Sequence, residues 1–193
     1  MPDAELTPEI IREFVIAAHF NADKVQSMLA EQPALLQARH QWGEGDYEDG
    51  LGAAAHVGSR RIAEYLLAQG APLTIFAAAM LGRTADAAAF LQADPTLANG
   101  HGAHRIPILF HAALSGDTAV TELLYTNGCR EGFNDAVHAA IMSRSVKMLE
   151  WLLEHGATDV QALNYEGKTP LKKAVEANEP QMISLLKNRG AVE

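Results

Sequence analysis

The feature that most constrains the fold of this chain is a helix–turn–helix pattern near its C-terminal end. Thr169-Pro170 starts it, because a Thr hydroxyl can accept an orphan backbone N–H and Pro fits the first helical position. An apolar face follows around Leu171, the chain resets near Pro180, and a second apolar set ends at Gly190. The pattern predicts a helix from Thr169, a turn, and a second helix closed by a glycine.

The same pattern recurs through the whole sequence. A pair of small or apolar residues marks the first helix of each unit, at intervals of roughly 24 to 37 residues. The six pairs are Ala17-Ala18, Ala54-Ala55, Ala78-Ala79, Ala112-Ala113, Ala140-Ile141 and Ala174-Val175. A repeat of this length predicts an array of stacked helix pairs, in which each unit buries its apolar face against its neighbours.

The repeated unit resembles the ankyrin repeat, whose signature includes Thr-Pro-Leu-His-x-Ala. The resemblance is carried by residues 51–58 and 62–71 of the second unit, by 136–141 and 148–157 of the fifth, and by 167–190 of the sixth, where Lys172 replaces the His. It implies an all-α ankyrin-repeat solenoid of about six helix–turn–helix repeats. It also implies that His138, at the signature position, hydrogen-bonds to backbone between repeats.

We expect a single domain over residues 1–193, with irregular or missing hairpins between repeats. The expected repeats cover approximately residues 7–38, 46–72, 73–98, 102–129, 131–158 and 164–193. Thr7-Pro8 predicts an extra turn of helix at the start of the first unit. Pro33 and Pro95 end the second helices of units one and three and predict short apolar extensions over the core. Only three residues, 72–74, precede unit three, which predicts that its hairpin is missing.

Composition excludes several functions. The chain has 15 Lys and Arg against 24 Asp and Glu, a formal net charge of −9, which argues against nucleic acid as a partner. Cys129 is the single cysteine, so no intramolecular disulfide can form, and a reducing compartment is expected. The sequence also lacks a signal-peptide pattern and an apolar stretch that could span a membrane. We therefore expect a cytoplasmic monomer with no membrane partner.

The usual enzyme motifs are missing. Gly167-Lys168-Thr169 resembles the end of a phosphate-binding loop, but Ala162 stands where that motif needs a glycine. Gly-x-Ser-x-Gly, His-Glu-x-x-His and complete Gly-x-Gly-x-x-Gly motifs do not occur. The sequence therefore predicts a non-catalytic module with no cofactor and no metal.

The linker of residues 42–49 combines four carboxylates with two aromatic side chains. Two interpretations stay open for it. Trp42 and Tyr47 can serve as rigid anchors within an acidic rim, formed by Asp46, Glu48 and their neighbours, for a basic partner. Alternatively, both aromatic residues pack on the neighbouring repeat and the segment is a solvated turn.

A group of histidines supports the alternative to a binding module. His101 and His104 lie three residues apart, and His111 follows on the first helix of unit four. These imidazoles could ligate a metal if the segment turned suitably, which would make the chain a small enzyme or a metal- or ligand-binding module that also uses the 42–49 linker. The other interpretation is a glycine-rich hairpin with exposed imidazoles.

Resemblance to the ankyrin family implies that a partner protein or peptide binds the concave face. That face is formed by hairpin tips and by the residues that follow each marker pair. Several of these are apolar, which would create an exposed adaptable patch; the alternative is that some are buried between repeats. The predicted partner-binding residues are Phe20, Trp42, Asp46, Tyr47, Glu48, His56, Val57, Met80, Leu81, His104, Leu114, Met142, Tyr165 and Glu166.

Overall fold

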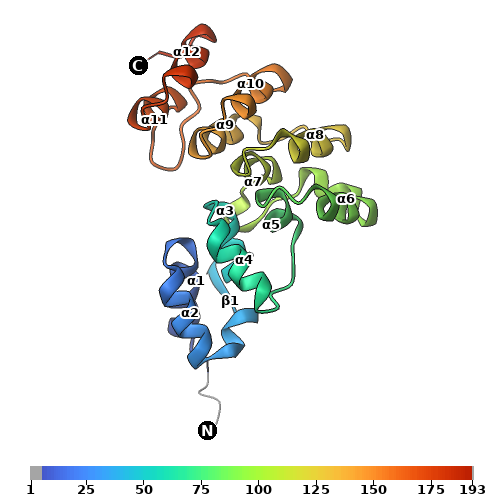
Figure 1. The fold of residues 1–193 in the computed structure, drawn as a ribbon, viewed down its shortest axis with the longest axis vertical. Helices are drawn as coiled ribbons and strands as arrows, with labels where there is room; N and C mark the ends of the chain where they lie inside the picture. The colour runs from blue at the N-terminus through green and yellow to red at the C-terminus, as the bar shows by residue number, and fades with distance from the viewer. Residues whose placement is uncertain (1–5, 193) are drawn as a thin grey trace.

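The protein is a curved stack of helix pairs, seen in a computed structural model that describes residues 6–192 (Figure 1). The first helices of the six pairs are α1 (Pro8–Phe20), α3 (Gly50–His56), α5 (Ile75–Met80), α7 (Ile108–Leu114), α9 (Phe133–Met142) and α11 (Pro170–Glu176). The second helices are α2 (Ala22–Glu31), α4 (Arg60–Ala68), α6 (Thr84–Ala93), α8 (Thr118–Thr126), α10 (Val146–His155) and α12 (Pro180–Asn188). The predicted all-α solenoid is confirmed.

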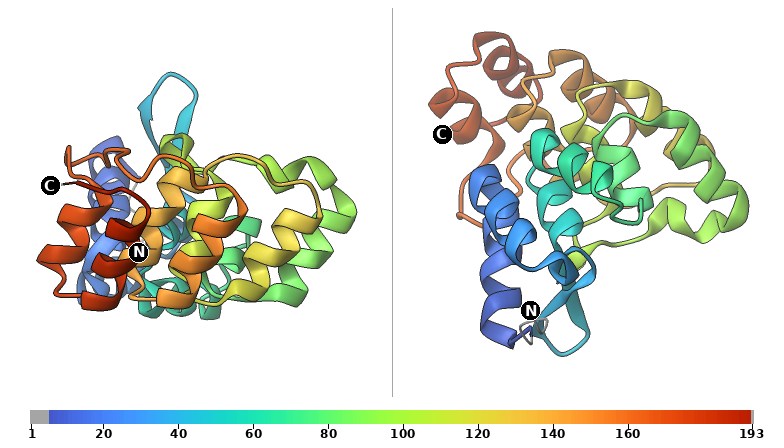
Figure 2. Two further views of the ribbon diagram at one scale, coloured as in Figure 1. Left: turned by 90° about the horizontal axis from the view of Figure 1, so that it is seen from above. Right: turned by 60° about the horizontal axis from the view of Figure 1, so that its bottom comes forward.

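The helices form two layers. Each first helix packs on the next one along the chain, from α1 to α11, and the second helices α6, α8, α10 and α12 also pack in sequence. In Figure 1 the stack is curved, with α6 and α8 on the outer side and α5 and α7 inside them. Figure 2 shows the helix pairs side by side, with the connecting segments gathered along one edge.

Small side chains allow the first helices to approach one another. The alanines of the marker pairs are buried, and Ala18, Ala54, Ala78, Ala113 and Ala140 have no exposed surface. Large side chains such as Leu66, Leu124, Met148 and Leu186 fill the space between the two layers. This division between a small-residue first helix and a bulky second helix is the predicted one.

The predicted helix starts and stops are also observed. Thr169 caps α11 by accepting a hydrogen bond from the Lys172 backbone N–H at 3.2 Å, and Pro170 is the first helical residue. Thr7 caps α1 in the same way, so the first unit has its extra turn. Gly190, with φ of +88°, follows the end of α12.

The two proline-terminated helices continue as short 3₁₀ helices, η1 (Pro33–Gln37) and η2 (Pro95–Asn99). Leu35 of η1 and Ala98 of η2 are buried, and Leu36 and Leu97 pack against the same cores. The predicted apolar extensions over the core are therefore present.

The long linkers after these extensions are ordered. Residues of the first linker form an antiparallel hairpin of β1 (Arg39–Gly43) and β2 (Asp46–Asp49), which projects from the stack (Figure 2). The second linker contains the 3₁₀ turn η3 (Ala103–Arg105), closed by a bridge between His101 and Pro107. No strand occurs in residues 69–74, so the hairpin before unit three is missing, as predicted.

The core divides at the third unit. One cluster of buried residues covers units one and two and includes Met80 and Leu81 of unit three. The other runs from Ile75 to the end of the stack. Leu73 and Leu114 pack against both clusters. The two clusters therefore meet at a seam around α5.

The prediction of an exposed apolar row is wrong in part. Met80 and Leu81 were expected along an exposed groove, but they are 1% and 6% exposed. α5 has only six residues, and its end is covered by the cluster of units one and two. The apolar row is therefore interrupted at unit three by burial between repeats.

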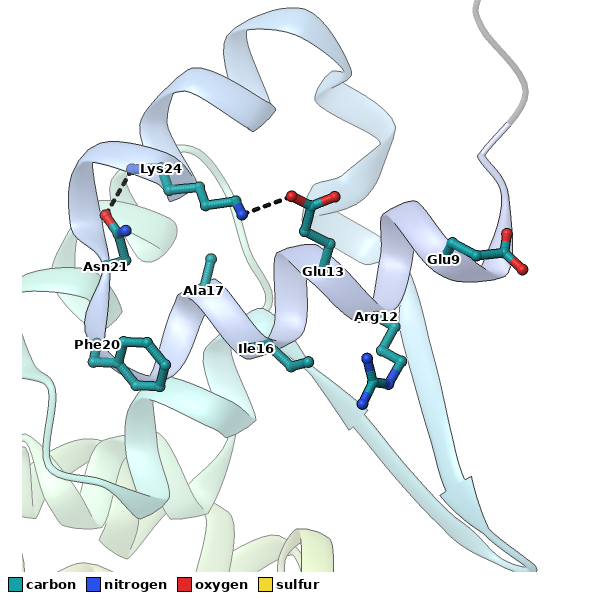
Figure 3. A pocket seen from close by; sticks show the side chains of 8 residues that line it. All are labelled: Glu9, Arg12, Glu13, Ile16, Ala17, Phe20, Asn21 and Lys24. Carbon is teal, nitrogen blue, oxygen red and sulfur yellow. Dashed lines mark hydrogen bonds and ion pairs between the residues drawn. The ribbon is translucent and has the colours of Figure 1, made fainter.

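An open hollow of about 390 Å³ lies along the exposed side of α1. Figure 3 shows its lining, in which Phe20 stands at one end and Glu13 pairs with Lys24 across it. None of the described helices is long and apolar enough to cross a membrane. The assignment of residues 1–193 to one domain, with the stated repeat limits, stays a prediction.

The tight contact between first helices can be tested at Ala113. We expect Ala113→Leu to lower the free energy of unfolding by about 1 to 3 kcal/mol, because three extra carbon atoms overpack a site with no exposed surface. Ala119→Leu, on the exposed side of α8, is the matched control and should change stability by less than about 0.5 kcal/mol. Urea unfolding measures both, and equal effects would contradict the assigned packing.

Candidate functional site

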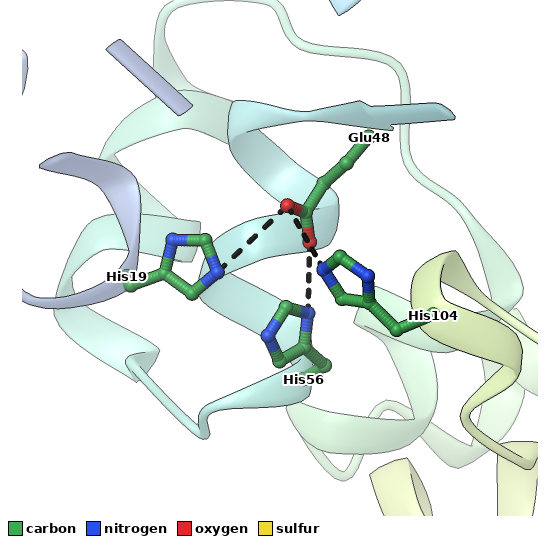
Figure 4. A group of neighbouring side chains, drawn as sticks. All are labelled: His19, Glu48, His56 and His104. Atoms are coloured by element: carbon green, nitrogen blue, oxygen red, sulfur yellow. Dashed lines mark ion pairs between the residues drawn. The ribbon is translucent and has the colours of Figure 1, made fainter. Parts of the chain in front are cut away.

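Four side chains from four separate elements converge on the edge of the stack where both linkers lie. They are His19 near the end of α1, Glu48 on β2, His56 at the end of α3 and His104 in η3 (Figure 4). One potential ligand atom of each lies within 4.8 Å of those of the other three. We call these four residues the His–Glu cluster.

Repeat stacking brings His19 and His56 together. Each follows the marker alanines of its unit, and α1 packs directly on α3. Equal positions of neighbouring repeats therefore lie side by side, and the two imidazole centroids are 4.8 Å apart. His104 completes the row from outside the repeat pattern, with its ring 5.3 Å from that of His56.

Glu48 is the buried centre of the cluster, with 1% of its surface exposed. Its Oε2 atom accepts a hydrogen bond from Trp42 Nε1 at 2.7 Å. The same oxygen lies 3.5 Å from His104 Nε2 and 3.8 Å from His19 Nε2. A buried carboxylate is costly unless it is paired, so the surrounding imidazoles are a requirement of its position.

Two imidazoles of the cluster are oriented by contacts of their Nδ1 atoms, on the side of the ring away from Glu48. His19 Nδ1 lies 2.9 Å from the Val15 carbonyl oxygen, and His104 Nδ1 lies 2.9 Å from Asp46 Oδ2. Because a carbonyl or carboxylate can only accept, each Nδ1 carries the proton and each Nε2 faces Glu48.

Asp46 also fixes the backbone of His104. Its Oδ1 accepts a hydrogen bond from the His104 backbone N–H at 2.9 Å. His104 and Arg105 have φ values of 56° and 57°, in the left-handed region that non-glycine residues seldom adopt. Backbone in this region costs free energy and is often found at functional sites. The hairpin thus holds η3 in a strained conformation that points His104 at Glu48.

The contact between His56 and Glu48 is close but badly aligned. His56 Nδ1 lies 2.9 Å from Glu48 Oε1. Nevertheless, neither atom makes a hydrogen bond of acceptable geometry with any residue that the structure describes, although both are buried. Unsatisfied buried polar atoms are rare in folded proteins, and those that occur often mark a functional site or the place of a water or ion.

The electrostatics of the cluster favour an ionised Glu48 carboxylate and a neutral His19 imidazole. Burial alone would raise the pKa of Glu48, but the contacts with His56, Trp42 and His19 outweigh it, and the pKa lies below its usual value. Burial lowers the pKa of His19; the Glu48 carboxylate acts in the opposite direction and His56 in the same one, and the pKa lies below its usual value. The hydrogen bond from the His104 backbone lowers the pKa of Asp46.

The three histidines that the sequence offered as an alternative metal site do not come together in the described structure. His104 belongs to the His–Glu cluster, whereas His101 lies 3.8 Å from Glu131, and His111 points into the core with Nδ1 bonded to the Pro107 carbonyl oxygen. His111 is 2% exposed, and burial lowers its pKa to about 4. His138 behaves as the resemblance implied, with Nε2 2.9 Å from the Ala162 carbonyl oxygen.

The acidic linker does not form a solvated rim. Glu48 is buried, Asp46 is bonded to His104, and Asp49 caps α3 through the Gly52 backbone N–H at 2.8 Å. Trp42 is half-buried and turned toward Glu48, so the packing interpretation holds for it. Tyr47 is 45% exposed and lies against Arg39, so it stays available at the surface.

The other predicted partner-binding residues vary in exposure. Phe20, Met142 and Tyr165 are 78%, 46% and 94% exposed, whereas Val57 and Leu114 are half-buried. Glu166 lies in an ion-pair network with Lys168 and Lys173, whose hydrogen bonds lower its pKa to about 2.

Comparison with known proteins supports the ankyrin-repeat family. Residues 109–192 match ankyrin repeats in three copies. Over this segment the chain is similar to the ankyrin-repeat family. It is also 29% identical over 104 residues to an ankyrin repeat protein of fowlpox virus (strain NVSL), with 51% of this chain matched. The matched segment covers 23% of the viral protein's length. Ankyrin repeats are generally protein–protein interaction modules and generally non-enzymatic.

Sequence reasoning missed the composition of the cluster, but a signal for part of it was present. His19 and His56 follow the marker alanines in consecutive units, and an ankyrin-repeat stack places such positions in contact. Glu48 and His104 had no such signal, because both come from linkers whose conformation does not follow the repeat.

The buried His111 predicts a loss of stability in acid. Its folded-state pKa of about 4 lies below the usual value of about 6.5, so the unfolded chain binds the proton more tightly between these pH values. Stability should therefore fall as the pH drops through this window. We expect this one group to account for about 2 to 3 kcal/mol between pH 7 and 4.5, and His111→Gln to remove that part of the slope.

Urea unfolding at the two pH values measures this effect. His101→Gln, which removes an exposed imidazole from the same linker region, is the control and should leave the slope unchanged. A His111→Gln protein with the full wild-type slope would contradict the inference that His111 is neutral in the folded state.

Proposed function

We propose that this chain is a non-catalytic module that binds a partner protein or peptide on its concave face. The observation that carries the proposal is the exposure of large apolar side chains at both ends of the inner surface. Phe20 at the end of α1 and Tyr165 in the loop before α11 are largely in solvent, and Met142 at the end of α9 is about half exposed. That loop lies on the inner side of the curve, opposite α1 (Figure 1).

Large apolar groups of this kind supply most of the binding energy in protein interfaces when a partner covers them. The net charge of −9 favours a partner with a basic surface, since complementary charge steers association. The single thiol, Cys129, is buried, and the proposed setting is the cytoplasm, with the chain acting as a monomer. Nucleic acid and membranes are not proposed as partners.

Reversing the charges of the 42–49 linker is a poor test of this function. Glu48 is buried, Asp46 holds His104, and Asp49 caps α3, so the changes would disturb the fold together with any contact. Site-specific crosslinking avoids this difficulty, because it reports on proximity and needs only an exposed position.

We expect a photoreactive phenylalanine analogue placed at Phe20, Met142 or Tyr165 to crosslink a common partner in cell extract. Gln92 on α6 and Glu154 on α10 are exposed positions on second helices and serve as controls that should not yield that product. Mass spectrometry identifies the product. Equal crosslinking from the control positions, or none from the three inner positions, would contradict binding at the concave face.

A further inference from the structure

We propose that His19, Glu48, His56 and His104 bind a divalent first-row transition-metal ion, with Zn²⁺ as the expected occupant. The inference goes beyond partner binding and does not depend on it. It replaces the trio of His101, His104 and His111 with a ligand set that shares only His104. The geometry that points to the site is the convergence of three imidazoles and one carboxylate from four elements.

The distances between the donor atoms fit such an ion. Zinc lies about 2.0 to 2.2 Å from nitrogen and oxygen ligands, so two ligands of a tetrahedral site are about 3.4 Å apart. Glu48 Oε2 lies 3.5 Å from His104 Nε2 and 3.8 Å from His19 Nε2. These separations are long for hydrogen bonds and match the edges of a coordination tetrahedron. The ligand atoms of all four residues lie within 4.8 Å of one another.

The direction of the donor atoms gives an independent reason. Nδ1 of His19 and of His104 is directed to the Val15 carbonyl and to Asp46, so both Nε2 atoms face Glu48 Oε2. An imidazole that donates through Nδ1 can offer its Nε2 atom to a metal ion. The two Nε2 atoms and the carboxylate oxygen are therefore directed at a common point.

The buried pair of unsatisfied atoms points to the same ligand. His56 Nδ1 and Glu48 Oε1 lie 2.9 Å apart, yet neither forms a well-aligned hydrogen bond within the part of the chain that the structure describes. Both atoms have a lone pair that a metal ion can accept. An ion bound by His56 Nδ1 and by the Glu48 carboxylate would provide this buried pair with a partner.

The groups behind the ligands are those that support metal sites. A metal-bound histidine almost always donates its other ring N–H to a carboxylate or a backbone carbonyl, which fixes the ring and raises its basicity. Asp46 has this role for His104, and the Val15 carbonyl has it for His19. Trp42 Nε1 donates to Glu48 Oε2 and orients the carboxylate.

The donor set defines the class of metal. Imidazole nitrogen suits zinc, copper, nickel and iron, whereas magnesium and calcium require mostly oxygen ligands. Four protein ligands complete a tetrahedral site, which is the arrangement of structural zinc. The side chain of His104 is 35% exposed and leaves a route from solvent.

The position of the cluster gives the ion a structural task. His19, Glu48 and His56 belong to units one and two, whereas His104 belongs to the linker that precedes unit four. The site therefore spans the seam where the two core clusters meet. An ion held there would join the two halves of the stack, so zinc should stabilise the folded chain.

The test uses the full chain, stripped with a chelator and dialysed, in calorimetric titrations at neutral pH. We expect one equivalent of Zn²⁺ to bind, to raise the melting temperature, and to be replaced by Co²⁺ with the visible absorption of a tetrahedral nitrogen and oxygen site. Mg²⁺ and Ca²⁺ should produce neither binding nor a melting shift. Absence of Zn²⁺ and Co²⁺ binding, or an equal response to Ca²⁺, would overturn the proposal.

Ligand variants locate the site. His104→Ala and Glu48→Gln should abolish binding at micromolar zinc, and Asp46→Asn should weaken it about 10- to 100-fold, because it alters the support of His104. His101→Ala is the matched control, since it removes an imidazole three residues from His104 and should leave the affinity unchanged. Circular dichroism and melting in chelator establish that each variant is folded; His104, the most exposed ligand, tolerates replacement best.

Full-affinity binding by folded His104→Ala and Glu48→Gln proteins would overturn the assigned ligands. An equal loss of binding in His101→Ala would do the same.

Discussion

The close approach of the first helices is the constraint on which the rest of the structure depends. Each repeat buries little surface alone, so stability comes from contacts between neighbours, and the alanines of the marker pairs set how near those neighbours come. The same contact determines chemistry at the edge of the stack. Because equal positions of adjacent repeats must lie side by side, two histidines at one repeat position become partners across units one and two.

The second constraint is the burial of Glu48. A carboxylate out of contact with water needs compensating donors or a cation, and the fold supplies them from segments that are otherwise irregular. The β1–β2 hairpin carries Glu48, Trp42 and Asp46, and η3 supplies His104 in a strained backbone conformation. The proline-terminated helices matter here, since both long linkers follow them and are thereby free to leave the repeat pattern.

Sequence reasoning succeeded where the repeat governs the structure. The six helix pairs, the Thr169 cap, the 3₁₀ extensions after Pro33 and Pro95, and the backbone contact of His138 follow from local rules and from the family pattern. It failed where two irregular segments meet. The partner of His104 is Asp46, 58 residues earlier in the chain, and nothing in either linker specifies that contact. Burial of Met80 and Leu81 was missed because it results from the short α5 and from packing across the seam.

The two proposals concern different parts of one curved surface, and they are linked by thermodynamics. The His–Glu cluster spans the seam, so an ion held there would restrict how units one and two sit relative to units three to six. That restriction would fix the separation between Phe20 at one end of the inner face and Tyr165 at the other. A partner that contacts both ends binds best when the helix stack has one particular curvature. A bound ion would also favour a particular curvature of the stack.

Coupling of this kind is reciprocal, so zinc would change the affinity for the partner by the same factor as the partner changes the affinity for zinc. Titrations of each with and without the other measure the two factors. If both affinities change, and by the same factor, the ion sets the shape of the binding face. Factors of one would mean that the cluster stabilises the seam without influence on binding, because a ligand with equal affinity for both shapes shifts neither.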